Sequence, residues 1–106
     1  MDRITSFMRK SQVEYRKYKK TNDSDYLAQA GEKLWNALLH LIEKKVGKKL
    51  RSFSDVKKAV SDIYQQTGDN TFLMLFNDAY SLHKNKLDAL YIRTYENLLY
   101  FKRGWT

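Results

Sequence analysis

The fold is decided by residues 25–46, DYLAQAGEKLWNALLHLIEKKV, which hold the strongest helical pattern in the chain. Apolar side chains recur there every three or four residues, as expected for a buried helix face. They are Leu27, Ala30, Leu34, Leu38, Leu41 and Val46, with Trp35, Leu39 and Ile42 widening the stripe. The width predicts a central helix buried on two sides. Lys44 and Lys45 suit the negative end of this helix, and Gly47 suits a left-handed residue that ends it.

Four further helical segments are predicted on either side of this one. They span residues 3–20, 54–66, 70–84 and 87–102. The chain has 106 residues, four glycines and no proline, so few residues interrupt a helix. Residues 84–86 form the joint between the last two segments, and the alternative is one long kinked helix. We therefore predict an all-α fold, an up-and-down bundle of four to five helices, formed by one domain over residues 1–106.

The same spacing sorts the side chains of the last two segments. The fourth segment is expected to share one inward face, made of Phe72, Leu73, Phe76, Ala79, Tyr80 and His83. The fifth is expected to turn Leu87, Leu90, Tyr91, Leu98 and Phe101 inward. The scattered carboxylates, namely Asp62, Asp78, Asp88 and Glu96, are expected to be mostly solvated.

Composition excludes several classes of protein. No run of about 18 apolar residues is present, which excludes a membrane span. The chain has no cysteine, and its two histidines, His40 and His83, lie far apart in sequence, so neither a metal nor a cofactor is expected. His40 lies in a densely apolar stretch and is expected to be a core histidine. The first residues lack an apolar signal segment, which favours a cytoplasmic protein.

A net charge of +8 makes an anionic partner plausible. Residues 9–20 hold six cations and one carboxylate, and residues 43–58 hold seven cations and two carboxylates. If the first two helices form an antiparallel hairpin, the two clusters lie at opposite ends of it. The second cluster is the better candidate for binding nucleic acid, because a helix end, a connector and a helix start converge there. Its candidate residues are Lys44, Lys45, Lys48, Lys49 and Arg51.

Two local patterns resemble a known family. Ala30–Ala37, AGEKLWNA, is similar to the A-x-E-K-L-W-x-A helix of archaeal PaREP-type proteins within the HEPN superfamily. Leu75–Asn85, LFNDAYSLHKN, is similar to their later L-F-x-x-A-x-x-L-H-x-N element. The order and spacing of the two also fit, over roughly residues 11–102. The resemblance ends after Asn85, where the family usually has Phe-Tyr-Glu and this chain has Lys86-Leu87-Asp88.

The resemblance implies a HEPN-like helical bundle that forms a homodimer. In HEPN ribonucleases an arginine, a following polar residue and a histidine form the catalytic motif, and two copies face each other across the dimer. His83 matches the histidine, Asp78 the polar residue, and Asn77 stands in place of the arginine. Asparagine supplies no fixed positive charge, and loss of one such electrostatic group commonly costs on the order of 10²–10³ in rate. The motif is therefore degenerate.

Three functions compete on this basis. The first is a non-catalytic HEPN-like binding module, working as a dimer with RNA, other nucleic acid or a partner protein. The second is a weak metal-independent endoribonuclease that uses His83, as the toxin of a two-component module with a nucleotidyltransferase-like antitoxin. The third is a structural helical bundle without a nucleic-acid role.

Aromatic residues near the end of the chain suggest a partner surface. Tyr91, Tyr95, Leu99, Tyr100 and Trp105 are too many to face one small core. The alternative is that these tyrosines stay half-exposed on a free surface.

Overall fold

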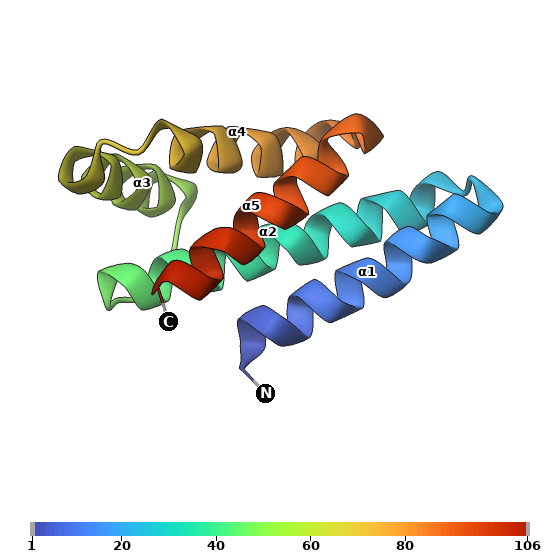
Figure 1. Cartoon of the computed structure of the whole chain (residues 1–106), viewed down its shortest axis with the longest axis horizontal. Coiled ribbons are helices and arrows are strands. Elements are labelled where there is room, and N and C mark those ends of the chain that lie inside the picture. The colour runs from blue at the N-terminus through green and yellow to red at the C-terminus, as the bar shows by residue number, and fades with distance from the viewer. Residues whose placement is uncertain (1, 106) are drawn as a thin grey trace.

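The computed structural model describes residues 2–105, and these residues are helical apart from short connections (Figure 1). In chain order the elements are α1 (Arg3–Thr21), α2 (Ser24–Val46), α3 (Phe53–Thr67), α4 (Asn70–Asn85), the short 3-10 turn η1 (Asp88–Leu90) and α5 (Tyr91–Trp105). Helices α1 and α4 run one way along the long axis, α2 and α5 run the other way, and α3 lies at one end (Figure 1). The predicted all-α, up-and-down bundle is confirmed.

Helix α2 is the centre of the molecule and contacts each of the other four α-helices. Its apolar stripe is buried as predicted, at Leu27, Ala30, Leu34, Trp35, Leu38, Leu41 and Ile42. The core around it also takes residues from every other helix. Because one helix touches all the others, the hydrophobic burial that stabilises the bundle is concentrated along its length.

Local capping residues set the ends of the helices. The Asp23 carboxylate accepts a hydrogen bond from the Asp25 amide at 2.9 Å, which caps the start of α2. Gly47 and Gly68 end α2 and α3 in the left-handed region, with φ of 75° and 62°. Asp69 caps α4. The predicted left-handed stop at Gly47 is confirmed.

Helices α4 and α5 are separate, so the alternative of one long kinked helix is wrong. Lys86 follows α4 with a left-handed φ of 53°, and its amide donates to the Leu82 carbonyl. η1 follows, and α5 begins at Tyr91, four residues later than predicted. Leu87, predicted to face inward, lies in this joint and is 46 % exposed.

The inward face of α4 differs from the predicted one. Its buried residues are Phe72, Leu75, Asp78, Ala79 and Leu82, whereas Leu73, Phe76, Tyr80 and His83 are half-buried. The cause is the close approach of α2, because a Cβ added at Gly31 would lie 3.1 Å from the Leu82 carbonyl oxygen. Because Gly31 has no side chain, Leu82 of α4 can pack closely against α2 and face the core. His83, the next residue on α4, then lies at the margin of the core. Of the four carboxylates expected to be mostly solvated, Asp62 and Glu96 are exposed, Asp88 is half-buried and Asp78 is buried.

A buried polar network joins α1, α2 and α5. The Ser11 hydroxyl donates to the Ala30 carbonyl at 2.7 Å and lies 2.8 Å from the Tyr91 hydroxyl. Burial raises the pKa of Tyr91 to about 12, so this hydroxyl stays protonated. The Tyr91 ring stacks on Tyr15 with ring centroids 3.8 Å apart. Tyr15 in turn donates to Asp88 at 2.7 Å. These contacts fix the start of α5 against the α1–α2 hairpin.

Residues 2–105 contain neither a helix suited to span a membrane nor a group of side chains suited to bind a metal ion. No helix within this range combines the length and apolarity that crossing a membrane requires. No three histidine, aspartate or glutamate side chains within it are grouped to hold a metal ion.

Candidate nucleic-acid interface

The three residues of the predicted motif lie on α4 but face three directions. Asn77 is exposed, Asp78 is buried against α5, and His83 is half-buried against α2. Successive residues of a helix are turned by about 100°. Asp78 and His83 therefore point about 140° apart around α4. A single subunit does not bring these side chains together.

The carboxylate of Asp78 is bound by an arginine that was not among the predicted site residues. Arg93 on α5 donates to it through Nε at 2.7 Å and through Nη2 at 2.8 Å. The Asp78 side chain is 10 % exposed and that of Arg93 is 52 % exposed. A bidentate pair of this kind fixes both side chains. A guanidinium thus reaches the motif, but from another helix and already bound to a carboxylate.

Arg93→Gln is expected to lower the midpoint of urea unfolding, because it leaves a buried carboxylate without its charged partner. Arg103→Gln is the matched control, since Arg103 lies exposed on the same helix. The control is expected to leave the midpoint nearly unchanged. Equal effects of the two substitutions would show that the Asp78–Arg93 pair does not stabilise the packing of α4 against α5.

His83 lies flat against Trp35 of α2. The ring centroids are 5.5 Å apart and the ring planes differ by 2°. Burial, and then the nearby charge of Lys84, lower the pKa of His83 below its ordinary value, while Glu32 acts in the opposite direction. The imidazole is therefore uncharged near neutral pH. An uncharged imidazole can accept a proton or take part in a stack of rings.

His83 is one member of a continuous group of rings, which we call the aromatic cluster. Its members are Trp35, Phe53, Phe76, Tyr80 and His83, from α2, α3 and α4. Trp35 lies at its centre, 5.6 Å from Tyr80 and 5.7 Å from Phe76 between ring centroids. Phe53 stacks on Tyr80 at 5.1 Å and is 43 % exposed. The cluster thus reaches from a half-buried histidine to an open aromatic surface.

The predicted basic residues separate into two groups. Lys44 and Lys45 lie in the last turn of α2, where Lys45 Nζ is 5.1 Å from the ring centroid of Trp105. Lys45 and Lys48 line one cavity with α3, of about 290 Å³. Arg51 lines another, of about 240 Å³, together with Trp35 and Phe53 of the aromatic cluster. Lys49 is exposed on the connector between the two groups.

The connector that carries these cations is held by hydrogen bonds to acidic side chains. The amide of Leu50 donates to Glu43 at 2.8 Å, and the amide of Arg51 donates to Asp55 at 3.1 Å. Both bonds use backbone donors, so the guanidinium of Arg51 is not needed to hold the connector. The exposed cationic side chain is therefore placed beside the aromatic cluster by a fixed backbone.

Two more cations lie near the aromatic cluster, although neither was among the predicted nucleic-acid-binding residues. Lys57 Nζ lies 5.8 Å from the centroid of the Phe53 ring. Lys84 follows His83 and lies close enough to lower the histidine pKa. The periodicity of α3 gave a partial signal for Lys57, since it lies one turn after Phe53. Together with Arg51, these cations surround a group of rings, an arrangement suited to a chain of phosphates and flat bases.

His40, predicted to be a core histidine, lies at the margin of the core instead. It is half-buried, stacks on Phe7 with centroids 5.4 Å apart, and has Nδ1 3.3 Å from Glu43 Oε1. Glu43 also accepts the connector amide of Leu50. His40 thus has partners on α1 and α2 and is separate from the aromatic cluster.

Comparison with known proteins gives one family. The family model described as the Archaeal PaREP1/PaREP8 family matches residues 7–98. No curated protein and no solved structure showed a significant match. The matched residues include both the Ala30–Ala37 helix and the Leu75–Asn85 element from which the resemblance was inferred. The chain therefore belongs to the archaeal PaREP1/PaREP8 family.

Proposed function

We propose that this chain is a non-catalytic, HEPN-like binding module that takes up single-stranded RNA on its aromatic cluster. The observation that carries the proposal is the ring contact from Phe53 through Tyr80 and Trp35 to His83. It joins the basic connector, at Arg51, to the histidine of the motif. One residue of each candidate site, Arg51 and His83, therefore lies beside the same group of rings.

The chemistry of this surface suits an unpaired strand. Phe53 is 43 % exposed and Tyr80 is half-buried, and bases would stack on the ring surface that these two residues leave open. Each base stacked on an aromatic ring contributes about 1–3 kcal/mol. Arg51, Lys57 and Lys84 lie around the rings, where they would meet phosphates. Bases in a duplex are already stacked and paired, so rings of this kind do not reach them. The HEPN-like assignment favours RNA over DNA as the ligand.

Two features argue that the surface binds RNA without cutting it. Asn77 supplies no positive charge, and the Arg93 guanidinium is bound to Asp78. Cleavage at the 2′-hydroxyl needs a neutralised phosphorane as well as a base. The uncharged imidazole of His83 could act as a base, and this observation is what favours the alternative, a weak metal-independent ribonuclease with an antitoxin partner.

Changing Arg51, Lys57 and Lys84 together to glutamate is expected to weaken binding of a fluorescent oligouridylate of about 10 nucleotides at least about tenfold. The slope of log K against log salt should also fall by about 2, because three phosphate contacts are lost. Fluorescence anisotropy between about 50 mM and 200 mM salt measures both quantities. No binding by the wild-type chain at the lower salt would overturn the proposal.

The matched control reverses Lys10, Lys17 and Lys20 on α1, which changes the net charge by the same amount. It is expected to retain most of the affinity, whereas a loss as large as that of the first variant would indicate unspecific attraction. Gel analysis of the same RNA in EDTA separates binding from cleavage. We expect the RNA to stay intact, and cleavage that His83→Ala abolishes would establish the ribonuclease alternative.

The HEPN-like assignment also implies a homodimer. Sedimentation equilibrium with and without the oligouridylate measures the mass of the particle directly. A dimer that persists at low protein concentration supports the assignment. A monomer that still binds RNA would support the proposed RNA binding but contradict the proposed homodimer.

A further inference from the structure

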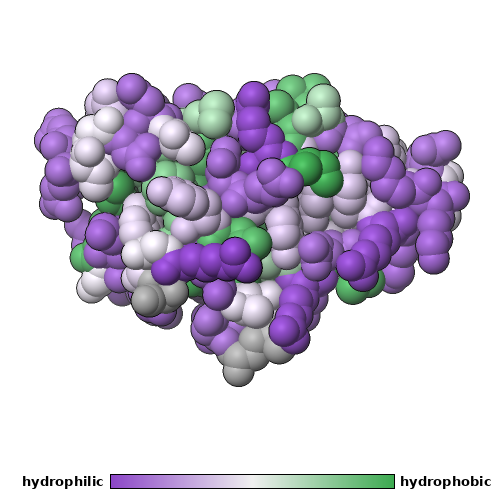
Figure 2. Space-filling view, in the orientation of Figure 1, coloured by the Kyte–Doolittle hydropathy of each residue, from purple (hydrophilic) through white to green (hydrophobic). Residues whose placement is uncertain are grey.

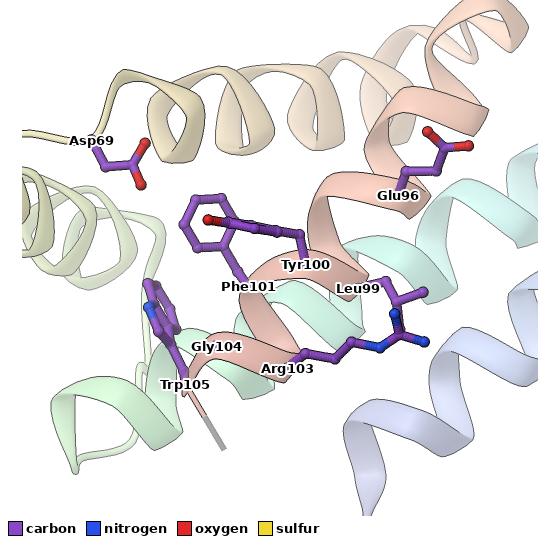
Figure 3. A pocket seen from close by; sticks show the side chains of 8 residues that line it. All are labelled: Asp69, Glu96, Leu99, Tyr100, Phe101, Arg103, Gly104 and Trp105. Carbon is purple, nitrogen blue, oxygen red and sulfur yellow. The ribbon is translucent and has the colours of Figure 1, made fainter.

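Three cavities lie in a row along the outer side of α5. They measure about 600 Å³, 330 Å³ and 140 Å³, and Leu99 lines all three. The first is an open hollow lined by the end of α5 and by Asp69 at the start of α4, with Arg103 extending toward α1 (Figure 3). The other two lie between α5 and α1, where Gln12 and Tyr95 line both. Glu96 is shared by the first two cavities, and we call the three cavities together the α1–α5 groove.

The groove is apolar because α5 carries two apolar faces. Its inward face packs Tyr91, Leu98 and Phe101 into the core. The outward face carries Ile92, Tyr95 and Leu99, at the spacing i, i+3 and i+7 of one helical stripe. Ile92 is 54 % exposed, and the neighbouring Tyr100 is 68 % exposed. Figure 2 shows apolar patches among strongly hydrophilic side chains on this side of the molecule. A second apolar face on a helix marks a binding surface.

The rim of the groove is basic. Arg9 and Arg16 line it from α1, and Arg103 lines it from α5. The carboxylates that line it are Glu96 and Asp69. Asp69 already accepts hydrogen bonds from two amides at the start of α4, so its charge is offset by the positive end of that helix. Glu96 is then the one remaining negative charge against three arginines, so the rim stays net positive and favours an acidic occupant.

We infer that the α1–α5 groove binds an acidic amphipathic helix of a partner protein. A helix whose apolar residues recur at i, i+3, i+4 and i+7 matches the outward stripe of α5. Its acidic flanks would meet Arg9, Arg16 and Arg103. The 15 residues of α5 give a groove about 20 Å long, enough for about four turns of a partner. A second copy of this chain fits less well, because it would bring the same basic rim and a net charge of +8.

The test uses three synthetic helical peptides of about 18 residues. The first carries a leucine stripe flanked by glutamates, the second has lysine at every glutamate, and the third has the first composition in scrambled order. Fluorescence anisotropy is expected to show salt-sensitive binding of the first peptide to the full chain, at least about tenfold tighter than the other two. Equal binding of the acidic and the basic peptide, or no binding, would overturn the inference.

Variants locate the peptide on the surface. Ile92→Glu and Arg103→Glu are expected to weaken binding of the acidic peptide at least about tenfold each, since one removes apolar contact and the other a cation. Met74→Glu is the matched control, because Met74 is an exposed apolar residue on α4, at 37 %. It should leave the affinity unchanged. An equal loss in the control, or displacement of the peptide by oligouridylate but not by unlabelled peptide, would contradict a helix site in this groove.

Discussion

Trp35→Ala is expected to lower the free energy of unfolding by about 3–5 kcal/mol. Trp35 is 8 % exposed and contacts four other members of the aromatic cluster, so its removal leaves a cavity between α2 and α4. This loss is a large part of the total stability of a domain of this size, about 5–15 kcal/mol. Urea unfolding followed by circular dichroism gives the difference between the variant and the wild-type chain.

Trp105→Ala is the control for the same change of side chain. Trp105 is half-buried at the end of α5. Its replacement by alanine is expected to lower the free energy of unfolding clearly less than Trp35→Ala does. Should the two losses be equal, Trp35 would not be the centre of the aromatic cluster.

A milder variant, Trp35→Leu, tests the link between the cluster and the charge state of His83. Burial is the main cause of the lowered pKa of His83, so opening the site to water should raise the pKa toward its ordinary value. In the wild-type chain the folded state favours the neutral imidazole. The lowered pKa of His83 therefore does not reduce the stability of the folded chain above the ordinary histidine pKa, about 6.5. As the pH falls below that value, the unfolded chain takes up the proton more readily than the folded chain, and stability is lost. NMR titration of the His83 ring measures the shift.

Gly31→Val is expected to destabilise the chain by about 3 kcal/mol, through overpacking between α2 and α4. A Cβ at this position would lie 3.1 Å from the carbonyl oxygen of Leu82 and 3.3 Å from its Cγ. The first contact is with backbone, which cannot move without shifting α4. Valine adds two methyl groups beyond that Cβ, at a position that is already buried. Urea unfolding measures the loss, and two-dimensional NMR shows whether the shifts spread along α4.

Gly104→Ala is the control for this substitution. Gly104 lies in α5 with no atom within 4 Å of an added Cβ, so alanine should be neutral or stabilise the helix by less than about 1 kcal/mol. A Gly31→Val chain as stable as the wild type would contradict the close approach of α2 to α4, and with it the position of His83.

The helices were predictable because their limits are encoded locally. Asp23, Gly47 and Gly68 each act within a few residues, on the amides and carbonyls of the nearest helix turn. The joint at Lys86 was harder, since a lysine in the left-handed region has no marker in the sequence. The inward face of α4 was also missed, because the approach of α2 at Gly31 decides which side of α4 faces the core.

The candidate site was only partly predictable for the same physical reason. His83, Asp78 and Arg51 were identified, but their partners lie on other helices. The contact of His83 with Trp35 spans 48 positions of the chain, and that of Asp78 with Arg93 spans 15. Neither contact leaves a pattern in the sequence of a single helix. Exposed lysines such as Lys57 acquire meaning only once the ring beside them is known.

The most direct test of the single aromatic and basic surface is an NMR titration of the labelled chain with unlabelled oligouridylate. We predict that the resonances of the His83 ring and of the amides of Arg51 and Phe53 shift together, with the same midpoint. The amide resonances of Asn22 and Asp23, at the turn between α1 and α2, should not change. Shifts confined to the α1–α2 turn or to the α1–α5 groove, with His83 unchanged, would contradict the account.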